Sequence, residues 1–132
     1  LCTARTMQGL EAPYSPFNPK HPCCIWAEES LGNYTWLLQH GLEMAREYTR
    51  RYGKTHRSET VIQWCQDSIT DMTFAKKRRT QFPQAMPEEY RVEGDAVAAY
   101  RNFYNYDKSR FAEWNHSRTP KWFQKLASKK EL

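Results

Sequence analysis

A short stretch of the sequence, residues 50–58 (RRYGKTHRS), gathers side chains suited to holding an anion. It joins the predicted end of one helix to the predicted start of the next, where free N–H groups and a partial positive charge attract phosphate. The two arginines that open the stretch could simply complement the negative end of the preceding helix. Lys54, His56 and Arg57 lie beyond that end. Their position favours an anion-binding site at this junction.

A second group of polar side chains follows one face of a predicted helix at residues 100–108 (YRNFYNYDK). Arg101, Asn105 and Lys108 recur at positions i, i+4 and i+7, so they form a polar stripe beside an aromatic one. Phosphates pair with Arg and Lys, and bases stack on aromatic rings, so this arrangement suits nucleic acid. The pattern also fits an amphipathic helix with buried rings and a solvated stripe, and taken alone it favours that alternative.

Two further stretches carry charged or metal-binding side chains. Residues 76–79 (KKRR) are four consecutive cations, which can bind backbone phosphate, although such runs are usually just solvated. Residues 21–24 (HPCC) resemble half of a metal site, but no second His or Cys pair stands at a ligand spacing. We therefore predict no metal centre and no cofactor.

Acid–base chemistry would fall to glutamates. Glu47, on a long predicted helix, and Glu89, beside Pro87 and Tyr90, are the candidate catalytic residues because they could face a shared cleft. Single carboxylates are more often surface or salt-bridge residues. The sequence contains none of the motifs of serine hydrolases, zinc proteases or nucleotide-binding loops, so those activities have no support.

Composition narrows the class of protein. With 132 residues, 39% of them hydrophobic, the chain is predicted to form one domain whose core uses many of its 5 Trp, 8 Tyr and 6 Phe. The net charge of +5 favours anionic partners. No apolar run approaches the roughly 20 residues that a membrane span needs, and no signal peptide is visible. We expect no membrane partner, a cytoplasmic location and four reduced cysteines.

Glycine, proline and helix-capping residues divide the first half of the chain into predicted helices. Gly9 ends a short first helix, and the four prolines of residues 10–22 predict an extended loop. Pro22 opens a short helix that runs to Ser30. Asn33 is the predicted N-cap of the clearest helix, which Gly53 ends. A glycine in the middle of that helix, Gly41, predicts a close crossing by another helix.

The second half is predicted to be helical as well. Ser58 caps the next helix, residues 70–94 are irregular apart from a turn at 86–90, and Asp95 caps a second long helix. The buried stripe predicted for that helix consists of Val97, Tyr100, Tyr104, Phe111 and Trp114. Thr119 and Pro120 open a last predicted helix that turns Trp122, Phe123 and Leu126 inward. No strand pattern appears, so the prediction is an all-α, single-domain compact helical bundle with long Pro-rich and basic loops.

Several segments, in order along nearly the whole chain, resemble a family of phage and bacterial proteins labelled pyrimidine-dimer DNA glycosylase-like. The matching segments are residues 1–4, 21–26, 29–30, 33–37, 47–54, 84–90, 99–104 and 120–123. Residues 86–91 (MPEEYR) and 118–122 (RTPKW) are also similar to the C-terminal half of the endonuclease V type of pyrimidine-dimer glycosylase, a small all-α DNA-repair enzyme. The resemblance implies an all-α fold and a DNA partner.

In that enzyme an N-terminal α-amine attacks the sugar carbon and a glutamate on the first helix assists, and neither has a counterpart in this sequence. The family also carries about thirty more residues in front, including a Cys-Asp-Lys-His stretch, by analogy with which we expect this chain to lack an N-terminal segment. The glycosylase and abasic-site lyase mechanism therefore stays open only if the natural protein is longer.

The resemblance and the residue patterns together assign roles to individual positions. The predicted nucleic-acid contacts are Arg51, Lys54, His56, Arg57, Arg101 and Lys108. The predicted pocket or base-stacking residues are His21, Trp26, Asn33, Tyr52, Tyr90 and Tyr104, of which Trp26, Tyr90 and Tyr104 would stack on or wedge against a displaced base. Glu47 and Glu89 are the predicted catalytic residues.

Three functions are consistent with these patterns. The first is a base-excision glycosylase-like protein of a phage or its bacterial host, which binds duplex DNA and acts on damaged or modified bases. The second is a non-catalytic nucleic-acid-binding accessory protein on the same scaffold. The third is a phage structural or interaction subunit whose exposed Tyr and Trp side chains bind a protein partner.

Overall fold

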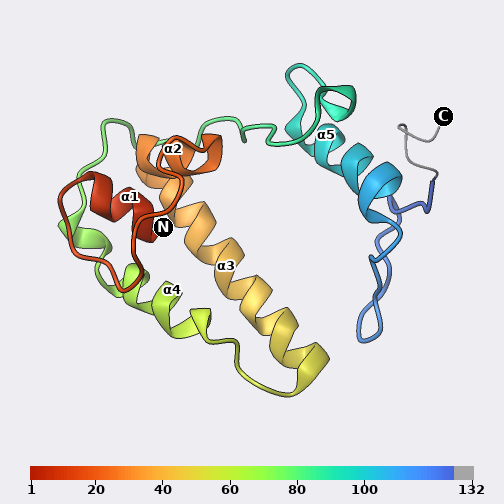
Figure 1. Cartoon of the computed structure of the whole chain (residues 1–132), viewed down its shortest axis with the longest axis horizontal. Coiled ribbons are helices and arrows are strands. Elements are labelled where there is room, and N and C mark those ends of the chain that lie inside the picture. Colours follow the sequence, from red (N-terminus) through yellow and green to blue (C-terminus); the bar gives the residue numbers. More distant parts are fainter. Residues whose placement is uncertain (127–132) are drawn as a thin grey trace. The chain divides into compact units, whose positions relative to one another are not determined.

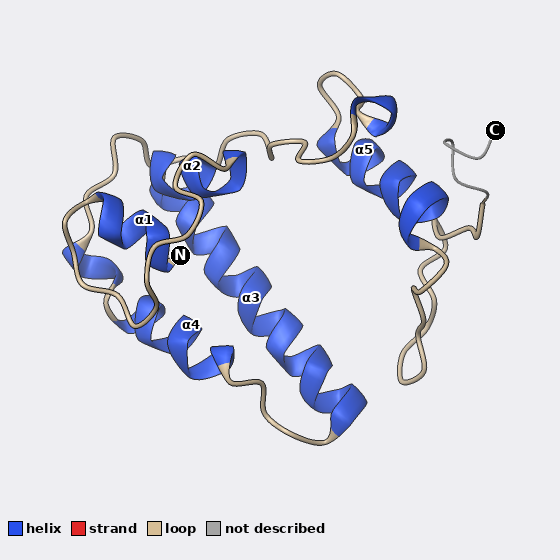
Figure 2. Cartoon of the chain, in the orientation of Figure 1, coloured by secondary structure: helices blue, strands red, loops and turns tan. Residues whose placement is uncertain are grey.

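The chain folds into helices joined by long loops (Figures 1 and 2), and the computed structural model describes residues 1–126. The all-α prediction is confirmed, because no strand is found among these residues. Contacts within the chain divide it into two compact units, Leu1–Thr80 and Gln81–Leu132. Each unit has its own hydrophobic cluster. That the two units together form one domain stays a prediction.

The first unit begins with two short helices whose ends follow the predicted signals. Helix α1 (Cys2–Met7) is followed by Gly9 in the left-handed region, with φ of 76°. Helix α2 (Pro22–Glu29) has Pro22 in its first turn, as predicted. His21 is the N-cap of α2, and its Nδ1 accepts a hydrogen bond from the N–H of Cys23 at 3.0 Å.

The long helix α3 (Leu31–Tyr52) starts two residues before the predicted cap, Asn33. Ser30 is the N-cap, and its hydroxyl oxygen accepts a hydrogen bond from the N–H of Asn33 at 3.0 Å. The prediction of Asn33 as the cap was therefore wrong. The end of the helix is as predicted, with Gly53 in the left-handed region at φ of 66°.

Helix α4 (Ser58–Asp67) returns along α3, as Figure 1 shows, and a 3₁₀ turn η1 (Ile69–Asp71) follows it. A Cβ atom at Gly41 of α3 would lie 3.0 Å from Cδ1 of Ile62 on α4, which confirms the predicted close crossing. Ser58 was predicted as the cap of α4, but Arg57 occupies that position and makes no side-chain cap bond. The N–H of Ser58 instead donates to Nδ1 of His56 at 3.0 Å.

The core of the first unit lies where α1, α2, α3 and α4 meet. Its buried members are Cys2, Ala4, Ala27, Tyr34, Leu38, Cys65 and Met72. Arg5 is also buried there, and its guanidinium donates to the carbonyls of Glu11 and Ser68, each at 2.9 Å. These hydrogen bonds tie the Pro-rich loop and the end of α4 to α1, so a buried charge organises this side of the unit.

The last residues of the first unit lie across the start of α3. The carbonyls of Lys76 and Lys77 accept hydrogen bonds from the N–H groups of Leu31 and Gly32, both at 2.9 Å, and a parallel bridge joins Ser30 and Lys76. These carbonyls satisfy two of the N–H groups that a helix leaves without partners at its start. The basic segment is therefore fixed to the helix.

The second unit contains the 3₁₀ turn η2 (Glu88–Tyr90), helix α5 (Ala96–Phe103) and the π-helical turn η3 (Tyr104–Lys108). Asp95 caps α5 as predicted, since its carboxylate accepts from the N–H of Ala98 at 3.0 Å. The predicted buried stripe is largely wrong: Val97, Tyr104 and Phe111 are exposed. The core consists of Met86, Tyr90 and Ala99, with Val92, Tyr100, Phe103 and Tyr106 packed against it.

The last predicted helix, from Thr119 onward, does not form within the described residues. The side chain of Asn105 on η3 instead forms hydrogen bonds with backbone groups of this segment. Its amide nitrogen donates to the carbonyl of Trp122 at 3.2 Å, and its amide oxygen accepts from the N–H of Gln124 at 2.9 Å. These contacts use backbone groups that would form hydrogen bonds within a helix. Residues 119–126 are therefore irregular and are held against η3 by Asn105.

None of the helices described in residues 1–126 is both long enough and apolar enough to span a membrane.

Candidate nucleic-acid interface

The arginines at the end of α3 are held by a glutamate. Arg50 and Arg51 pair with opposite oxygens of the Glu47 carboxylate, at 2.7 and 3.2 Å. One turn earlier, Arg46 pairs with Glu43. Arg50 and Arg51 therefore complement the end of the helix and its own acid, as the alternative interpretation of this stretch proposed. Glu47, predicted to be catalytic, has both oxygens engaged by guanidinium groups.

The basic residues just beyond the end of α3 form no ion pair with an acidic side chain among residues 1–126. Lys54, His56 and Arg57 are exposed, and no carboxylate oxygen among residues 1–126 lies within ion-pair distance of Lys54 or Arg57. Within residues 1–126 the charges of Lys54 and Arg57 therefore face solvent without an acidic partner, whereas His56 uses its Nδ1 as a hydrogen-bond acceptor. Three of the predicted contacts are thus brought together at one place, whereas Arg51 is largely used within the helix.

Two aromatic rings, those of Tyr48 and Tyr52, lie near these basic residues. The ring of Tyr48 lies 4.8 Å from that of Tyr52 and meets the ring of His56 edge-on at 4.7 Å, with an angle of 88°. Tyr52 is 62% exposed. His56 is fixed twice, by Tyr48 and by the bond that its Nδ1 accepts. We call Tyr52, Lys54, His56 and Arg57 the junction surface, an exposed ring followed along the chain by three exposed basic residues on a helix–helix connection.

The start of α4 is not the phosphate-binding site that the sequence suggested. The N–H groups of Ser58 and Glu59 donate to Nδ1 and to the carbonyl of His56, at 3.0 and 3.1 Å. Glu59 also brings a negative charge into the first turn. A shallow pocket of about 480 Å³ beside it is lined by both acids and arginines. Its lining residues are Glu43, Arg46, Thr49, Arg50, Thr55 and Glu59. An anion at the junction would therefore be held by side chains rather than by the helix end.

The second unit brings another pair of predicted residues together. The guanidinium of Arg101 lies 5.5 Å from the ring centre of Trp122, and the ring of Tyr104 meets the same Trp edge-on at 6.3 Å. Tyr104 is 43% exposed. Lys108 points its ammonium at the rings of Phe103 and Phe111, at 5.0 and 5.5 Å. Arg101 and Tyr104 thus offer a cation and a ring side by side, whereas Lys108 covers apolar rings.

Three of the predicted pocket residues have structural roles. Trp26 is 6% exposed, and Asn33 and Tyr90 are fully buried, so none offers a face to a base at the surface in this conformation. The Asn33 amide nitrogen donates to the carbonyl of Trp26 at 2.8 Å and to the hydroxyl of Thr80 at 2.9 Å. Its amide oxygen accepts from the N–H of Thr80 at 2.8 Å. Asn33 therefore fastens helix α2 and the loop at Thr80 to α3.

The remaining predicted site residues lie on the surface. His21 is exposed and serves as the cap of α2. Glu89 is exposed on η2 and belongs to the second unit, whereas Glu47 belongs to the first. Within residues 1–126 no group of three or more His, Cys, Asp or Glu side chains is arranged to hold a metal ion.

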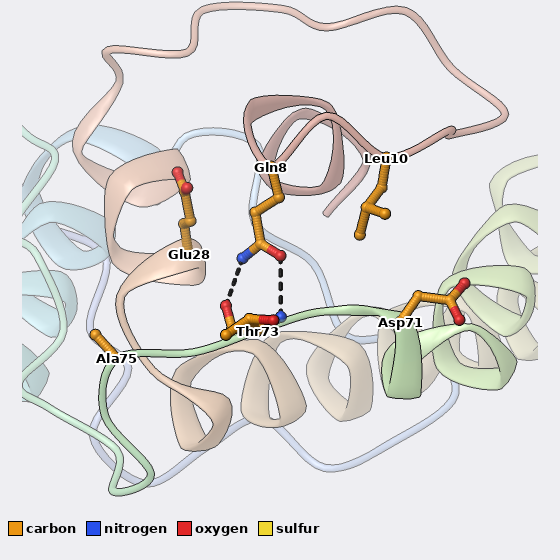
Figure 3. Close-up of a pocket in the computed structure, with 6 residues that line it drawn as sticks. All are labelled: Gln8, Leu10, Glu28, Asp71, Thr73 and Ala75. Carbon is orange, nitrogen blue, oxygen red and sulfur yellow. Dashed lines mark hydrogen bonds between the residues drawn. The ribbon is translucent and has the colours of Figure 1, made fainter.

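Sequence reasoning missed one pocket, shown in Figure 3, of about 360 Å³ in the first unit. Its lining residues are Gln8, Leu10, Glu28, Asp71, Thr73 and Ala75. The amide of Gln8 makes two hydrogen bonds with the backbone of Thr73, at 2.7 and 3.1 Å, and lies between the two carboxylates in the view. The side chain of Asp71 pairs with the buried Arg5 at 3.4 Å. The acidic lining makes this pocket unsuitable for phosphate.

The core of the first unit contains a buried group of two thiols and a phenol. The sulfur atoms of Cys2 and Cys65 are 4.0 Å apart, and both thiols are free. Burial raises the pKa of Cys65, and burial together with the neighbouring Cys65 raises that of Tyr34. The neutral forms of both side chains are therefore favoured by the fold, as expected of core residues.

No family model matches the chain, and neither the curated proteins nor the solved structures compared with it contain a match.

Proposed function

We propose that this protein binds the phosphate backbone of duplex DNA through the junction surface. The observation that carries the proposal is that Lys54, His56 and Arg57, which follow the exposed Tyr52 along the chain, are themselves exposed and have no acidic partner among residues 1–126. Cations neutralise phosphates and release their counterions, which is the main source of sequence-independent affinity for DNA. The exposed ring of Tyr52 adds a stacking face for an unpaired base.

Two further observations support a nucleic-acid partner. The second unit repeats the combination of a cation and exposed ring in Arg101 and Tyr104, next to Trp122. The formal charge of +5 favours the same class of partner.

The finer form of the proposal is a base-excision glycosylase-like activity on damaged or modified bases, which rests on the resemblance described above. In this form Tyr52 and Tyr104 are the stacking or wedging side chains, because they are the exposed tyrosines of the predicted set. Glu89 and Glu47 are the candidate carboxylates of this activity, and both oxygens of Glu47 are engaged by arginines. A non-catalytic DNA-binding accessory protein shares the binding surface and differs only in lacking this chemistry.

DNA binding is tested with a fluorescein-labelled duplex and fluorescence anisotropy at several salt concentrations. We expect Lys54→Ala/Arg57→Ala to weaken binding of every duplex sequence alike and to reduce the slope of log K against log salt by roughly 0.9 for each lost phosphate contact. Arg46→Ala is the matched control, because Arg46 is an exposed arginine of the same unit that is already paired with Glu43. An equal effect of the control and the double variant would contradict the proposal.

Catalysis is tested separately by base release and strand scission on duplexes that contain ultraviolet-damaged or chemically modified bases. The glycosylase form predicts product from the wild-type chain and a loss of product in Glu89→Gln with DNA binding retained. Bound DNA without product on any of these duplexes would leave the accessory protein as the function and remove the glycosylase.

A further inference from the structure

The basic segment at residues 76–79 (KKRR), here called the basic strip, is held in place at both ends. At its start, the carbonyls of Lys76 and Lys77 accept from the N–H groups of Leu31 and Gly32. Just past its end, the N–H of Thr80 donates to the buried amide oxygen of Asn33 at 2.8 Å. A run of cations in a loop usually loses conformational entropy when it binds, whereas this backbone is already ordered.

The contact between the strip and α3 is a close backbone approach that only glycine permits. A Cβ atom at Gly32 would lie 2.4 Å from the backbone nitrogen of Arg79 and 2.9 Å from the backbone carbon of Arg78. Backbone atoms held by hydrogen bonds on either side cannot move aside as a flexible side chain can. The identity of residue 32 therefore determines whether the strip can lie against the helix.

The side chains of the strip are exposed while its backbone is bound. All four cations lie on the surface, and Lys76 pairs with Glu29 at 3.1 Å. Lys77 and Arg78 have no carboxylate within ion-pair distance among residues 1–126. Since the first N–H groups of α3 are satisfied by carbonyls of the strip, an anion there would meet the side chains and not the helix end.

We propose that the basic strip is a second phosphate-binding site, in which Lys77 and Arg78 contact neighbouring phosphates of the nucleic-acid backbone. Consecutive exposed cations on a backbone that is held in place suit a linear polyanion, in which charges follow one another along a strand. The inference rests on the proposed function and adds to it a site that acts through a preorganised backbone. It reverses the expectation from sequence that this run is merely solvated.

The charge of the strip is tested in the full chain by fluorescence anisotropy with a labelled duplex. Lys77→Ala/Arg78→Ala should bind roughly 10- to 100-fold more weakly at 0.1 M salt, with a slope of log K against log salt smaller by roughly 0.9 for each lost contact. Gln39→Ala, at an exposed and uncharged position on α3, is the control for a surface substitution in the same unit. A wild-type slope in the double variant would overturn the inference.

Preorganisation is tested by Gly32→Ala, which changes no charge. It should weaken DNA binding at least several-fold with helical circular dichroism retained. Gly41→Ala is the matched control, because it is the same substitution in the same helix and its new Cβ meets only the side chain of Ile62. If Gly32→Ala fails to fold, the charge variant decides alone. A folded Gly32→Ala that binds DNA as tightly as Gly41→Ala would overturn the role of the backbone contact between the basic strip and α3.

The outcomes also separate this inference from the proposed function. Failure of the wild-type chain to bind duplex DNA at low salt would overturn both. Binding that depends on Lys54 and Arg57 but not on Lys77 and Arg78 would overturn the basic strip alone. Vesicles containing phosphatidylserine provide the last comparison: a double variant that loses vesicle binding but keeps DNA binding would identify the strip as a lipid-headgroup site and contradict the proposal.

Discussion

A single amide, that of Asn33, joins three segments of the first unit. It bonds to the carbonyl of Trp26, to the hydroxyl of Thr80 and to the N–H of Thr80, and it is fully buried. Buried polar groups that lose their partners carry the full cost of desolvation. Sequence reasoning identified Asn33 as special but assigned it to a cap and a base pocket, because a capping side chain and a buried bridging amide look alike in a sequence.

We predict that Asn33→Ala lowers the free energy of unfolding by about 2–4 kcal/mol, since it leaves the N–H of Thr80 and the carbonyl of Trp26 without their partner. Urea denaturation followed by circular dichroism measures the change. Gln39→Ala on the exposed side of the same helix should stay within about 0.5 kcal/mol of wild type. A stable Asn33→Ala that has lost only DNA binding would restore the original pocket assignment.

The buried Cys65 makes stability sensitive to alkaline pH. The pKa of its thiol is raised above the ordinary value of 9.0, chiefly by burial. The unfolded chain therefore releases this proton at a lower pH than the folded chain does, so the stabilisation is complete below pH 9 and is lost as the pH rises further.

Urea denaturation of the wild-type chain from pH 7 to 10 should show a free energy of unfolding that decreases above pH 9. The decrease should be smaller in Cys65→Ala, which lacks the titrating group, although Tyr34, whose pKa is also raised, adds a decrease of its own at higher pH. Parallel pH profiles for the two proteins would show that the thiol has no such effect.

At the scale of the helices, local signals predicted the ends where no competing group is near. Pro22, Asp95, Gly9 and Gly53 act as expected at the start or end of a helix. The prediction failed where two groups compete for one role or where the register changes. Ser30 caps α3 in place of a nearby Asn, and the turn at η3 changes from α to π hydrogen bonding. That change moves later side chains off the predicted stripe.

The caps provide a prediction at this scale. Ser30→Ala and Asp95→Ala each remove the acceptor of a cap bond and should lower the free energy of unfolding by about 1 kcal/mol. Ser58→Ala should cost less than about half as much, because Ser58 lies inside α4 and makes no cap bond. Thermal or urea denaturation of the three variants checks the ranking. A larger loss in Ser58→Ala than in Ser30→Ala would contradict the observed start of α3.

For the molecule as a whole, the all-α fold class could be predicted from the sequence, but which of the charged side chains are paired could not. A charge run can be recognised in a sequence, but whether it is paired depends on acids brought near by the fold. Thus Arg51 is occupied by Glu47, whereas Lys54 and Arg57 are unpaired within residues 1–126. Burial of Trp26 and Tyr90 follows in the same way from the packing around them, which spacing alone does not specify.

The most direct test of DNA binding at the junction is lysine footprinting of the unmodified chain. The protein is acetylated briefly with and without saturating duplex DNA, and the modification of each lysine is measured by mass spectrometry. The account predicts that DNA protects Lys54, while Lys20, exposed in the Pro-rich loop, reacts at the same rate in both samples. Equal modification of Lys54 in the presence and absence of bound DNA would contradict it.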